Sequence, residues 1–320
     1  MKFFTTLLRV LPFASLALGF ANPLSCSGTC TNTHDPAIIK RSSDGTYFRF
    51  ATGGSLSVHS GPKIQGPWTY KGQVLSSFSS DAWAPDVQQL PDGSYILYYS
   101  VSKFGTQDSY IGVATSKTLN AGSWTNYGQT GLKSKAGDPY NAIDANLFQE
   151  GGKNYVFFGS FWQDIFYTTA SSNGRTINLS SSKPVNVQFN GTGEQAAEAA
   201  YLFKKSNYYY LFFSAGKCCG YNANALPRKG EEYSIRVCRA SSPTGPFKDK
   251  AGKACTQGGG TMVLASHGWV YGPGGQGVLG GTDKGDVLYY HHVDTRVGYG
   301  DGDKRLGVNV IDWSSGWPVV

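Results

Sequence analysis

Acidic residues recur in one kind of sequence context. A short apolar segment begins at or just after four acids: Asp35 in "HDPAII", Asp86 in "APDVQQL", Asp144 in "IDANLF" and Glu198 in "AEAAYLF". If the fold brings these segment starts together, the carboxyl groups crowd one another and at least one pKa must rise. Two carboxyl groups with unequal pKa values can cleave a glycosidic bond, one as base and the other as acid.

This chemistry gives three of the acids a role. Hydrolysis with inversion needs a base that activates water and an acid that protonates the leaving oxygen, with the two carboxyl groups about 6.5 to 9.5 Å apart. We expect Asp35 to be the base and Glu198 the acid. Asp144 would lie close enough to Glu198 to raise its pKa and orient it. From residue chemistry alone, Asp35 is explained equally well as the aspartate of a strand start.

The segments that follow the acids share one plan. Each has a strand, a turn built from Gly, Asn or Asp, and a second strand dense in Tyr and Phe, as in "DPAIIKRSSDGTYFRFAT". The first four starts are about 50 to 60 residues apart, a spacing typical of propeller blades. The starts are Asp35, Ala84, Ile143, Ala197 and, as a looser match, Gly272. The pattern predicts an all-β fold, a five-bladed β-propeller whose inner strands begin at one end of a central channel. A β-sandwich with coincidental hairpins is the alternative.

The start of the chain predicts export. Residues 1–21 combine Lys2 and Arg9 with an apolar run too short to span a bilayer and with small residues for cleavage. We expect residues 22–320 to form a single secreted catalytic domain, a monomer. The net charge is +7, but the basic residues are scattered, so nucleic-acid and membrane partners are not expected. The 20 Tyr and 7 Trp either pack against sugars or fill β cores.

Six cysteines suit an oxidising compartment and allow 15 connectivities. Proximity along the chain favours Cys26 with Cys30 and Cys238 with Cys255, which leaves Cys218 and Cys219 as a possible vicinal pair. Two sequons, at Asn178 and Asn190, agree with export.

The motifs carry a family resemblance over nearly the whole chain after the leader. The segments "THDPAII", "NAIDANLF", "AEAAYLF" and "YYHHVD" resemble the motif set of family 43 glycoside hydrolases, which are inverting enzymes on a five-bladed propeller. Within that family, "WAPDV", "FGTQDS", "SAGKCCGY", "YGPGGQGV" and "DWSSGWPVV" resemble secreted fungal endo-1,5-α-L-arabinanases. The resemblance implies Asp35 as general base, Asp144 as pKa modulator and Glu198 as general acid.

The chain departs from these motifs in places. Ala145 stands where proline is common after the modulator, and Ala199 and Ala200 follow the acid where other small residues or proline are usual. No functional group is lost, so we expect activity to be retained. Glu194, four residues before Glu198, lacks a following apolar strand and is expected on the surface.

Other residues suggest a sugar-binding groove. Trp83 and Phe104 are candidates for stacking against furanose rings, with core packing as the alternative. Gly105 leaves room for a ligand beside the backbone. The same motif positions in the resembling enzymes imply further contacts. Hydrogen bonds are expected from Asn141 and Ser160, and cleft walls from Phe161 and Trp162. Asp86 either orients the groove or has a structural role.

His291 follows the last aromatic strand. A lone histidine in a β core is usually just hydrogen-bonded, and His292 could exchange roles with it. The resemblance places the first histidine in the central channel near a water-coordinated ion such as Ca²⁺. We expect no cofactor for the chemistry, and any ion would be structural and bound through water, because no Asp-rich calcium loop is present.

Together these features predict endo-hydrolysis of internal α-1,5-L-arabinofuranosyl bonds in linear arabinan, a pectin side chain, with inversion. The alternatives are an exo-acting arabinofuranosidase or β-xylosidase on the same fold, and a carbohydrate-binding propeller without turnover.

Overall fold

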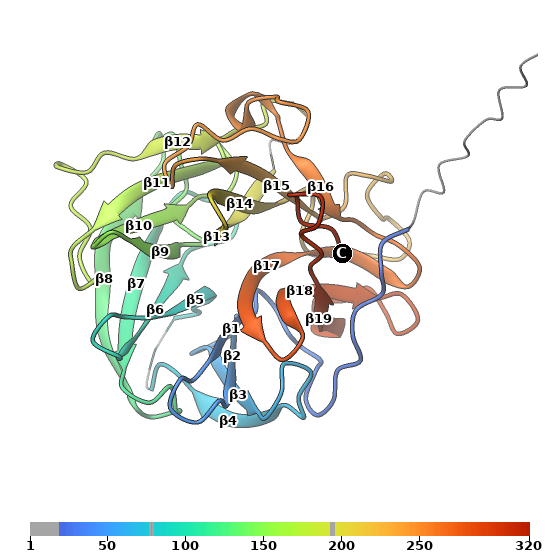
Figure 1. The fold of residues 1–320 in the computed structure, drawn as a ribbon, viewed down its shortest axis with the longest axis horizontal. Coiled ribbons are helices and arrows are strands. Elements are labelled where there is room, and N and C mark those ends of the chain that lie inside the picture. Colours follow the sequence, from blue (N-terminus) through green and yellow to red (C-terminus); the bar gives the residue numbers. More distant parts are fainter. Residues whose placement is uncertain (1–18, 77, 79, 193–195) are drawn as a thin grey trace, which may run out of the picture.

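The strands form five small antiparallel sheets arranged around a central axis (Figure 1). This computed structural model describes residues 19–76, 78, 80–192 and 196–320. The predicted five-bladed β-propeller is confirmed. Most of the predicted leader, residues 1–21, and Glu194 lie outside the described residues.

Each blade runs in chain order from an inner to an outer strand. Blade 1 contains β1 (Ala37–Lys40), β2 (Tyr47–Ala51), β3 (Ser57–Gly61) and β4 (Thr69–Gln73). Blade 2 contains β5 (Trp83–Gln89), β6 (Tyr95–Val101), β7 (Ser109–Ser116) and β8 (Trp124–Ser134). Blade 3 contains β9 (Asn146–Glu150), β10 (Lys153–Phe158), β11 (Ile165–Ala170) and β12 (Val185–Gln188). Blade 4 contains β13 (Ala197–Lys205), β14 (Tyr208–Ala215), β15 (Ser234–Ala240) and β16 (Thr261–Leu264). Blade 5 contains β17 (Val270–Thr282), β18 (Gly285–Asp294) and β19 (Lys304–Val310).

The helices of the described chain are two 3₁₀ turns, η1 (Cys255–Gln257) and η2 (Asp301–Asp303). Among the described residues, no helix has the length and apolar character needed to cross a membrane.

The first two strands of each blade follow the sequence pattern. The second strand is dense in aromatic and branched residues, such as YILYYSV in β6, and its residues are almost entirely buried. A residue with positive φ turns the chain between the strands, for example Gly93 with φ +84° between β5 and β6. Gly93 therefore supplies a backbone conformation that other residues adopt only at a cost.

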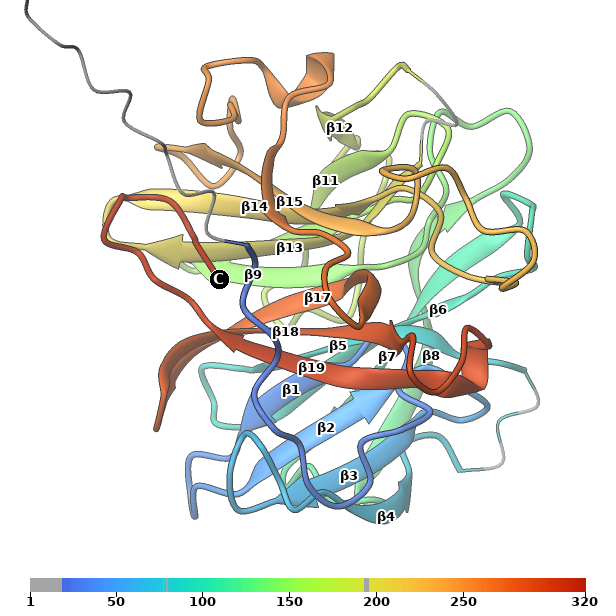
Figure 2. The same ribbon diagram turned by 90° about the vertical axis from the view of Figure 1, so that its right-hand side faces the viewer.

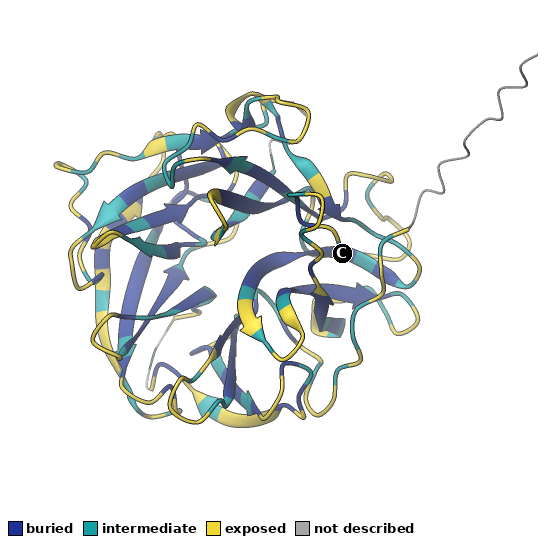
Figure 3. Ribbon diagram, in the orientation of Figure 1, coloured by how far each residue is buried: buried dark blue, intermediate teal, exposed yellow. Residues whose placement is uncertain are grey.

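The apolar core is divided among the joints between blades. Each of five buried clusters combines residues of two neighbouring blades, as Phe50 of blade 1 and Leu97 of blade 2 do. Burial is accordingly continuous around the ring and weakest on outer strands and loops (Figure 3). The cavity in the central channel is lined by both polar residues, such as Asp35 and Asp144, and small apolar ones, such as Ala84 and Ala199.

The ring closes where the two ends of the described chain meet. Blade 5 has three strands, and the segment before blade 1 runs beside its outer strand β19 (Figure 2). Leu24 N–H donates to Val308 O at 2.8 Å, and Leu306 N–H donates to Cys30 O at 3.0 Å. Thr33 N–H donates to Lys304 O at 3.1 Å, two residues before Asp35. Ring closure therefore positions the start of blade 1.

Three disulfides join Cys26 to Cys30, Cys238 to Cys255, and the adjacent Cys218 and Cys219. The favoured pairing and the vicinal pair are both confirmed.

We predict that Leu306→Ala lowers the free energy of unfolding by about 2 to 4 kcal/mol, because it leaves a cavity between blades 5 and 1. Denaturant unfolding followed by circular dichroism measures this. Val310→Ala on the same strand is the control: Val310 is 43% exposed, so its loss should be below about 1 kcal/mol. Equal losses of unfolding free energy in the two variants would show that Leu306 is not part of the buried cluster between blades 5 and 1.

Candidate active site

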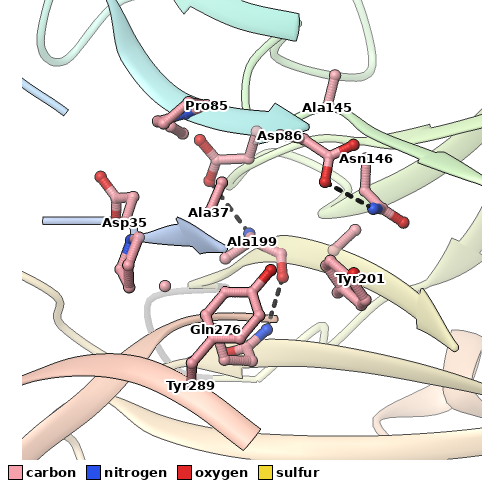
Figure 4. Close-up of a pocket in the computed structure, with 15 residues that line it drawn as sticks. Asp35, Ala37, Pro85, Asp86, Ala145, Asn146, Ala199, Tyr201, Gln276 and Tyr289 are labelled. Atoms are coloured by element: carbon pink, nitrogen blue, oxygen red, sulfur yellow. Dashed lines mark hydrogen bonds between the residues drawn. The ribbon is translucent and has the colours of Figure 1, made fainter. Parts of the chain in front are cut away.

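The five inner strands share one backbone feature where they face the channel. Asp35, Ala84, Asp144, Ala199 and Gly275, which lie on or just before these strands, each adopt a left-handed conformation with φ between +41° and +58°. All five line one cavity in the central channel (Figure 4). For a residue other than glycine this conformation costs roughly 1 to 2 kcal/mol, and such strain clusters at functional sites.

A recurring hydrogen bond holds these residues. In four of the five joints, the backbone N–H of the left-handed residue points at a side-chain atom at or near the end of the preceding blade's second strand. The atoms that face Ala84, Asp144, Gly275 and Asp35 are Thr52 Oγ1 (2.8 Å), Ser100 Oγ (2.9 Å), Ser214 Oγ (3.0 Å) and His291 Nδ1 (3.0 Å). The joint between blades 3 and 4 differs: Ala199 N–H donates to Asp144 Oδ2 at 3.1 Å.

The acids occupy different positions relative to this feature. Asp35 and Asp144 are left-handed residues themselves, and Glu198 directly precedes one. Asp86 lies two residues past Ala84 and is 7% exposed. Its carboxylate accepts hydrogen bonds from Leu147 N–H at 2.8 Å and from an Asn146 amide at 3.1 Å (Figure 4). Burial raises the pKa of Asp86 to about 6. The structure therefore gives Asp86 a structural role, tying blade 2 to blade 3.

Asp35 lies between blades 1 and 5. Its Oδ2 accepts a hydrogen bond from Thr52 Oγ1 at 2.7 Å, and its Oδ1 lies 3.4 Å from His291 Nδ1. Burial opposes ionisation, but the contacts with His291 and Thr52 and the charge effects outweigh it, so the pKa of Asp35 lies well below its ordinary value. An ionised carboxylate can accept a proton from water.

Glu198 is held by two hydroxyl groups. Ser160 Oγ donates to Glu198 Oε2 at 2.5 Å, and Tyr233 donates from its hydroxyl to Oε1 at 2.8 Å. Burial, the largest influence, raises the pKa of Glu198; the hydrogen bonds oppose this, and the Asp35 charge adds to it. Glu198 is therefore suited to carry a proton.

Asp144 contacts the strand that carries Glu198 through the Ala199 N–H. Burial and the charges of Glu198 and Asp35 raise the pKa of Asp144 well above its ordinary value. Because crowded carboxylates cannot all ionise, the Asp144–Glu198 pair retains at least one proton when Asp35 is charged. The Tyr233 ring, which bonds Glu198, stacks on His291 with centroids 5.7 Å apart, so contacts run from one acid to the other.

The expected groove residues fall into two groups. Phe104 is 84% exposed and Phe161 and Trp162 are 36% and 37% exposed, whereas Trp83 is half-buried. The exposure of Phe104 excludes core packing for that residue. Gly105, with φ +77°, has open space where a β-carbon would be.

The polar candidates are engaged within the protein. Asn141 is 5% exposed, and its Oδ1 accepts hydrogen bonds from Ser109 at 2.7 Å and Ser134 at 3.4 Å. The Ser160 hydroxyl bonds Glu198. Contacts of these residues with a sugar remain predictions.

The surroundings of His291 do not fit the ion that the resemblance led us to expect. The ring is 1% exposed, and a lysine ammonium, Lys304 Nζ, lies 3.2 Å from its Nε2. Among the described residues, no three His, Cys, Asp or Glu side chains are placed to hold a metal. His292 packs against Trp269 and Tyr290, away from the acids, so it does not exchange roles with His291.

Several residues of the site were missed from sequence: Thr52, Ser100, Tyr233, Gln276 and Lys304. Among these, Gln276 lines the cavity and its amide donates to Ala199 O at 2.7 Å (Figure 4). A signal existed for Thr52 and Ser100. The repeated aromatic strands end in "YFRFAT", "YILYYS", "YVFFGS", "YYLFFS" and "VLYYHH", and the last or next-to-last residue of each bonds the channel mouth. Tyr233 and Lys304 stand in segments that resemble ordinary strand starts.

Comparison with known proteins gives a family. The model of Glycosyl hydrolases family 43 matches residues 29–318. A probable arabinan endo-1,5-alpha-L-arabinosidase A of Aspergillus clavatus is 57% identical over 314 residues, 96% of each chain. A GH43 endo-arabinanase structure from Bacillus licheniformis aligns with a TM-score of 0.79 and 31% identity, covering 92% of this chain and 99% of that one. An exo-1,5-alpha-L-arabinanase from a bovine ruminal metagenomic library aligns with a TM-score of 0.79 and 26% identity over the same shares.

We predict that Gly275→Ala destabilises the protein by about 2 to 5 kcal/mol, from left-handed strain and overpacking. Its β-carbon would lie 2.5 Å from Asp35 Oδ1 and 2.8 Å from the His291 ring. The control is Gly105→Ala, with positive φ but open space, which should cost about 1 to 2 kcal/mol. Urea unfolding measures both, and a Gly275 variant no worse than the control would refute the packing described for Asp35.

Proposed function

The chain belongs to glycosyl hydrolases family 43, and from this premise we propose that it hydrolyses internal α-1,5-L-arabinofuranosyl bonds of linear arabinan with inversion. The family match spans residues 29–318, and the curated relative at 57% identity carries the name of this activity. The observation that supports the catalytic roles is that Asp35 and Asp144 line one cavity, while Glu198 directly precedes Ala199 of the same lining. The pKa of Asp35 is displaced downward and those of Asp144 and Glu198 upward.

The residues divide the reaction as follows. Asp35, ionised, removes a proton from a water that attacks the anomeric carbon from one face of the sugar. Glu198, protonated, gives its proton to the departing oxygen on the opposite face. Asp144 orients the acid through the Ala199 N–H, and the charge of Glu198 raises the pKa of Asp144, so the two carboxyl groups titrate as neighbours. Attack by water without a covalent enzyme intermediate inverts the anomeric centre.

Export is part of the proposal. The predicted leader and three disulfides support a protein made for an oxidising, extracellular setting. A monomer formed by residues 22–320, without nucleic-acid or membrane partners, remains our prediction.

An exo-acting enzyme is the second candidate, because an exo-1,5-alpha-L-arabinanase shares this fold. We predict that debranched arabinan first yields mixed oligosaccharides, and that NMR of fresh product shows the inverted anomer. Release of arabinose alone from the start would support the exo alternative, and retention would exclude the roles given to Asp35 and Glu198.

The same assay with variants tests the residues. Asp35→Ala and Glu198→Ala should each lower kcat by about 10² to 10⁴-fold, because each removes a proton-transfer group. Glu231→Ala, at an exposed loop acid, is the matched control and should retain full activity. Unfolding midpoints show whether a loss has a structural origin. Undiminished hydrolysis by the Glu198 variant would contradict the mechanism.

We predict that Tyr233→Phe moves the alkaline limb of the pH–rate profile to higher pH. The Tyr233 hydroxyl lowers the pKa of Glu198, so its removal raises that pKa and keeps the acid protonated further into the alkaline range. Profiles of kcat/KM against pH measure the limb. An unchanged or downward-shifted alkaline limb would show that Glu198 is not the group titrating there.

A further inference from the structure

Lys304 is a lysine buried beside the proposed active site. Its side chain is 0% exposed, and lysine is almost never fully buried unless it is paired. The Nζ atom donates to Cys218 O at 2.7 Å, lies 3.2 Å from His291 Nε2 and lies 3.9 Å from Asp301 Oδ1. The mechanism above gives this residue no role.

Hydrogen-bond donors face both nitrogens of the His291 ring. The Asp35 backbone N–H points at Nδ1 at 3.0 Å, and Lys304 Nζ faces Nε2 at 3.2 Å. Burial and the Lys304 charge lower the pKa of His291 to about 3, so the ring is neutral. A neutral imidazole accepts at only one nitrogen and donates at the other. The two contacts therefore compete.

We propose that Lys304 is a positioning residue for the base: its ammonium fixes the His291 tautomer that carries the proton on Nδ1, directed at the Asp35 carboxylate. The proposal rests on the role of Asp35 proposed above. An ammonium has donors and no lone pair, so Nε2 must accept from it. The ring proton then lies on Nδ1, 3.4 Å from Asp35 Oδ1.

The energies favour this tautomer. It makes one hydrogen bond with a charged donor, from Lys304 to Nε2, worth about 1.5 to 3 kcal/mol, and it turns the Nδ1 proton toward the Asp35 carboxylate at 3.4 Å, where the attraction is electrostatic. The other tautomer makes one neutral hydrogen bond, worth about 0.5 to 1.5 kcal/mol, and turns an N–H toward a buried ammonium. The gain outweighs the loss of the Asp35 N–H bond.

The surroundings favour a charged Lys304. Its Nζ atom has three acceptor atoms around it, Cys218 O at 2.7 Å, His291 Nε2 at 3.2 Å and Asp301 Oδ1 at 3.9 Å, which match the three protons of an ammonium. Burial lowers the pKa of Lys304, and the charges of Asp35, Asp301 and Glu198 oppose that effect. Three other titratable groups lie beside this cluster. The ring centroids of His34 and Tyr233 are 5.3 Å and 5.7 Å from that of His291, and the ring centroid of Tyr221 is 5.9 Å from Nζ. The ammonium thus supplies positive charge beside His291, near which we had expected an ion.

The test is the tautomer itself, which does not depend on turnover. In wild type labelled with ¹⁵N-histidine, the ring of His291, assigned by its loss in His291→Gln, should show the proton on Nδ1. In Lys304→Met it should move to Nε2, because the Asp35 N–H then keeps Nδ1 as acceptor. A wild-type ring protonated at Nε2, or a ring unchanged by the substitution, would overturn the proposal.

Kinetics give a second readout. Without the ammonium the Asp35 pKa rises, so the acidic limb of kcat/KM in Lys304→Met should move up by about one pH unit, a tenfold loss on that limb. Lys304→Arg should restore much of it. Arg49→Met, which removes a buried cation away from the site, should lower stability without moving the limb. An equal shift in the Arg49 variant, or none in Lys304→Met, would count against Lys304.

Added Ca²⁺ and EDTA complete the test. If the ammonium occupies the ion position, neither should change the unfolding temperature of the wild type, and metal analysis should find no stoichiometric ion. A stoichiometric Ca²⁺ that stabilises the wild type would overturn that part. Loss of hydrolysis in the Asp35 variant alongside an Nε2-protonated His291 would refute the positioning role while leaving the proposed function intact.

Discussion

The structure depends on crowding three carboxyl groups at one end of a narrow channel. Like charges in a poorly solvated site cannot all remain ionised, and each must be matched by a proton, a donor or a counter-charge. Asp35 contacts the Thr52 hydroxyl and His291, which in turn contacts Lys304. Glu198 instead accepts a hydrogen bond from the Ser160 hydroxyl, and Asp144 accepts one from a backbone N–H. This unequal support lowers the pKa of Asp35 and raises the pKa values of Glu198 and Asp144.

The propeller supplies that support through one repeated joint. A backbone N–H on or just before each inner strand faces a side chain from a neighbouring blade. At three joints that side chain is a hydroxyl, and at the other two it is a residue of the proposed active site. A histidine replaces the usual hydroxyl where blade 5 meets blade 1. Where blade 3 meets blade 4, Asp144 accepts the backbone N–H, which releases the Ser160 hydroxyl to hold Glu198. The site and the ring therefore use the same bonds.

Much of this was predictable from sequence, because hairpin units at a regular spacing and an acid before an apolar strand are local signals. The register was not. Bulges after Trp83 and Glu198 shift the inner strands, so Asp86 falls two residues beyond the channel mouth and Ala84 takes its place. Asn141 and Ser160 bond to Ser109 and Glu198, which lie tens of residues away in the sequence, so these hydrogen bonds could not be predicted from local patterns. Lys304 follows the acidic run "DGD" and has the sequence context of an exposed turn, although its side chain is buried.

The meeting of the two chain ends has a kinetic consequence. Thr33 pairs with Lys304, and Asp35 contacts His291, so the proposed base is held between the first and last blades. A partly renatured chain with four native blades would show most of the β-sheet circular dichroism signal, but the contacts that hold Asp35 between blades 5 and 1 would not yet have formed. Recovery of the β-sheet signal during renaturation would then follow the folding of the individual blades. Recovery of hydrolysis would follow the later pairing of the N-terminal segment with blade 5.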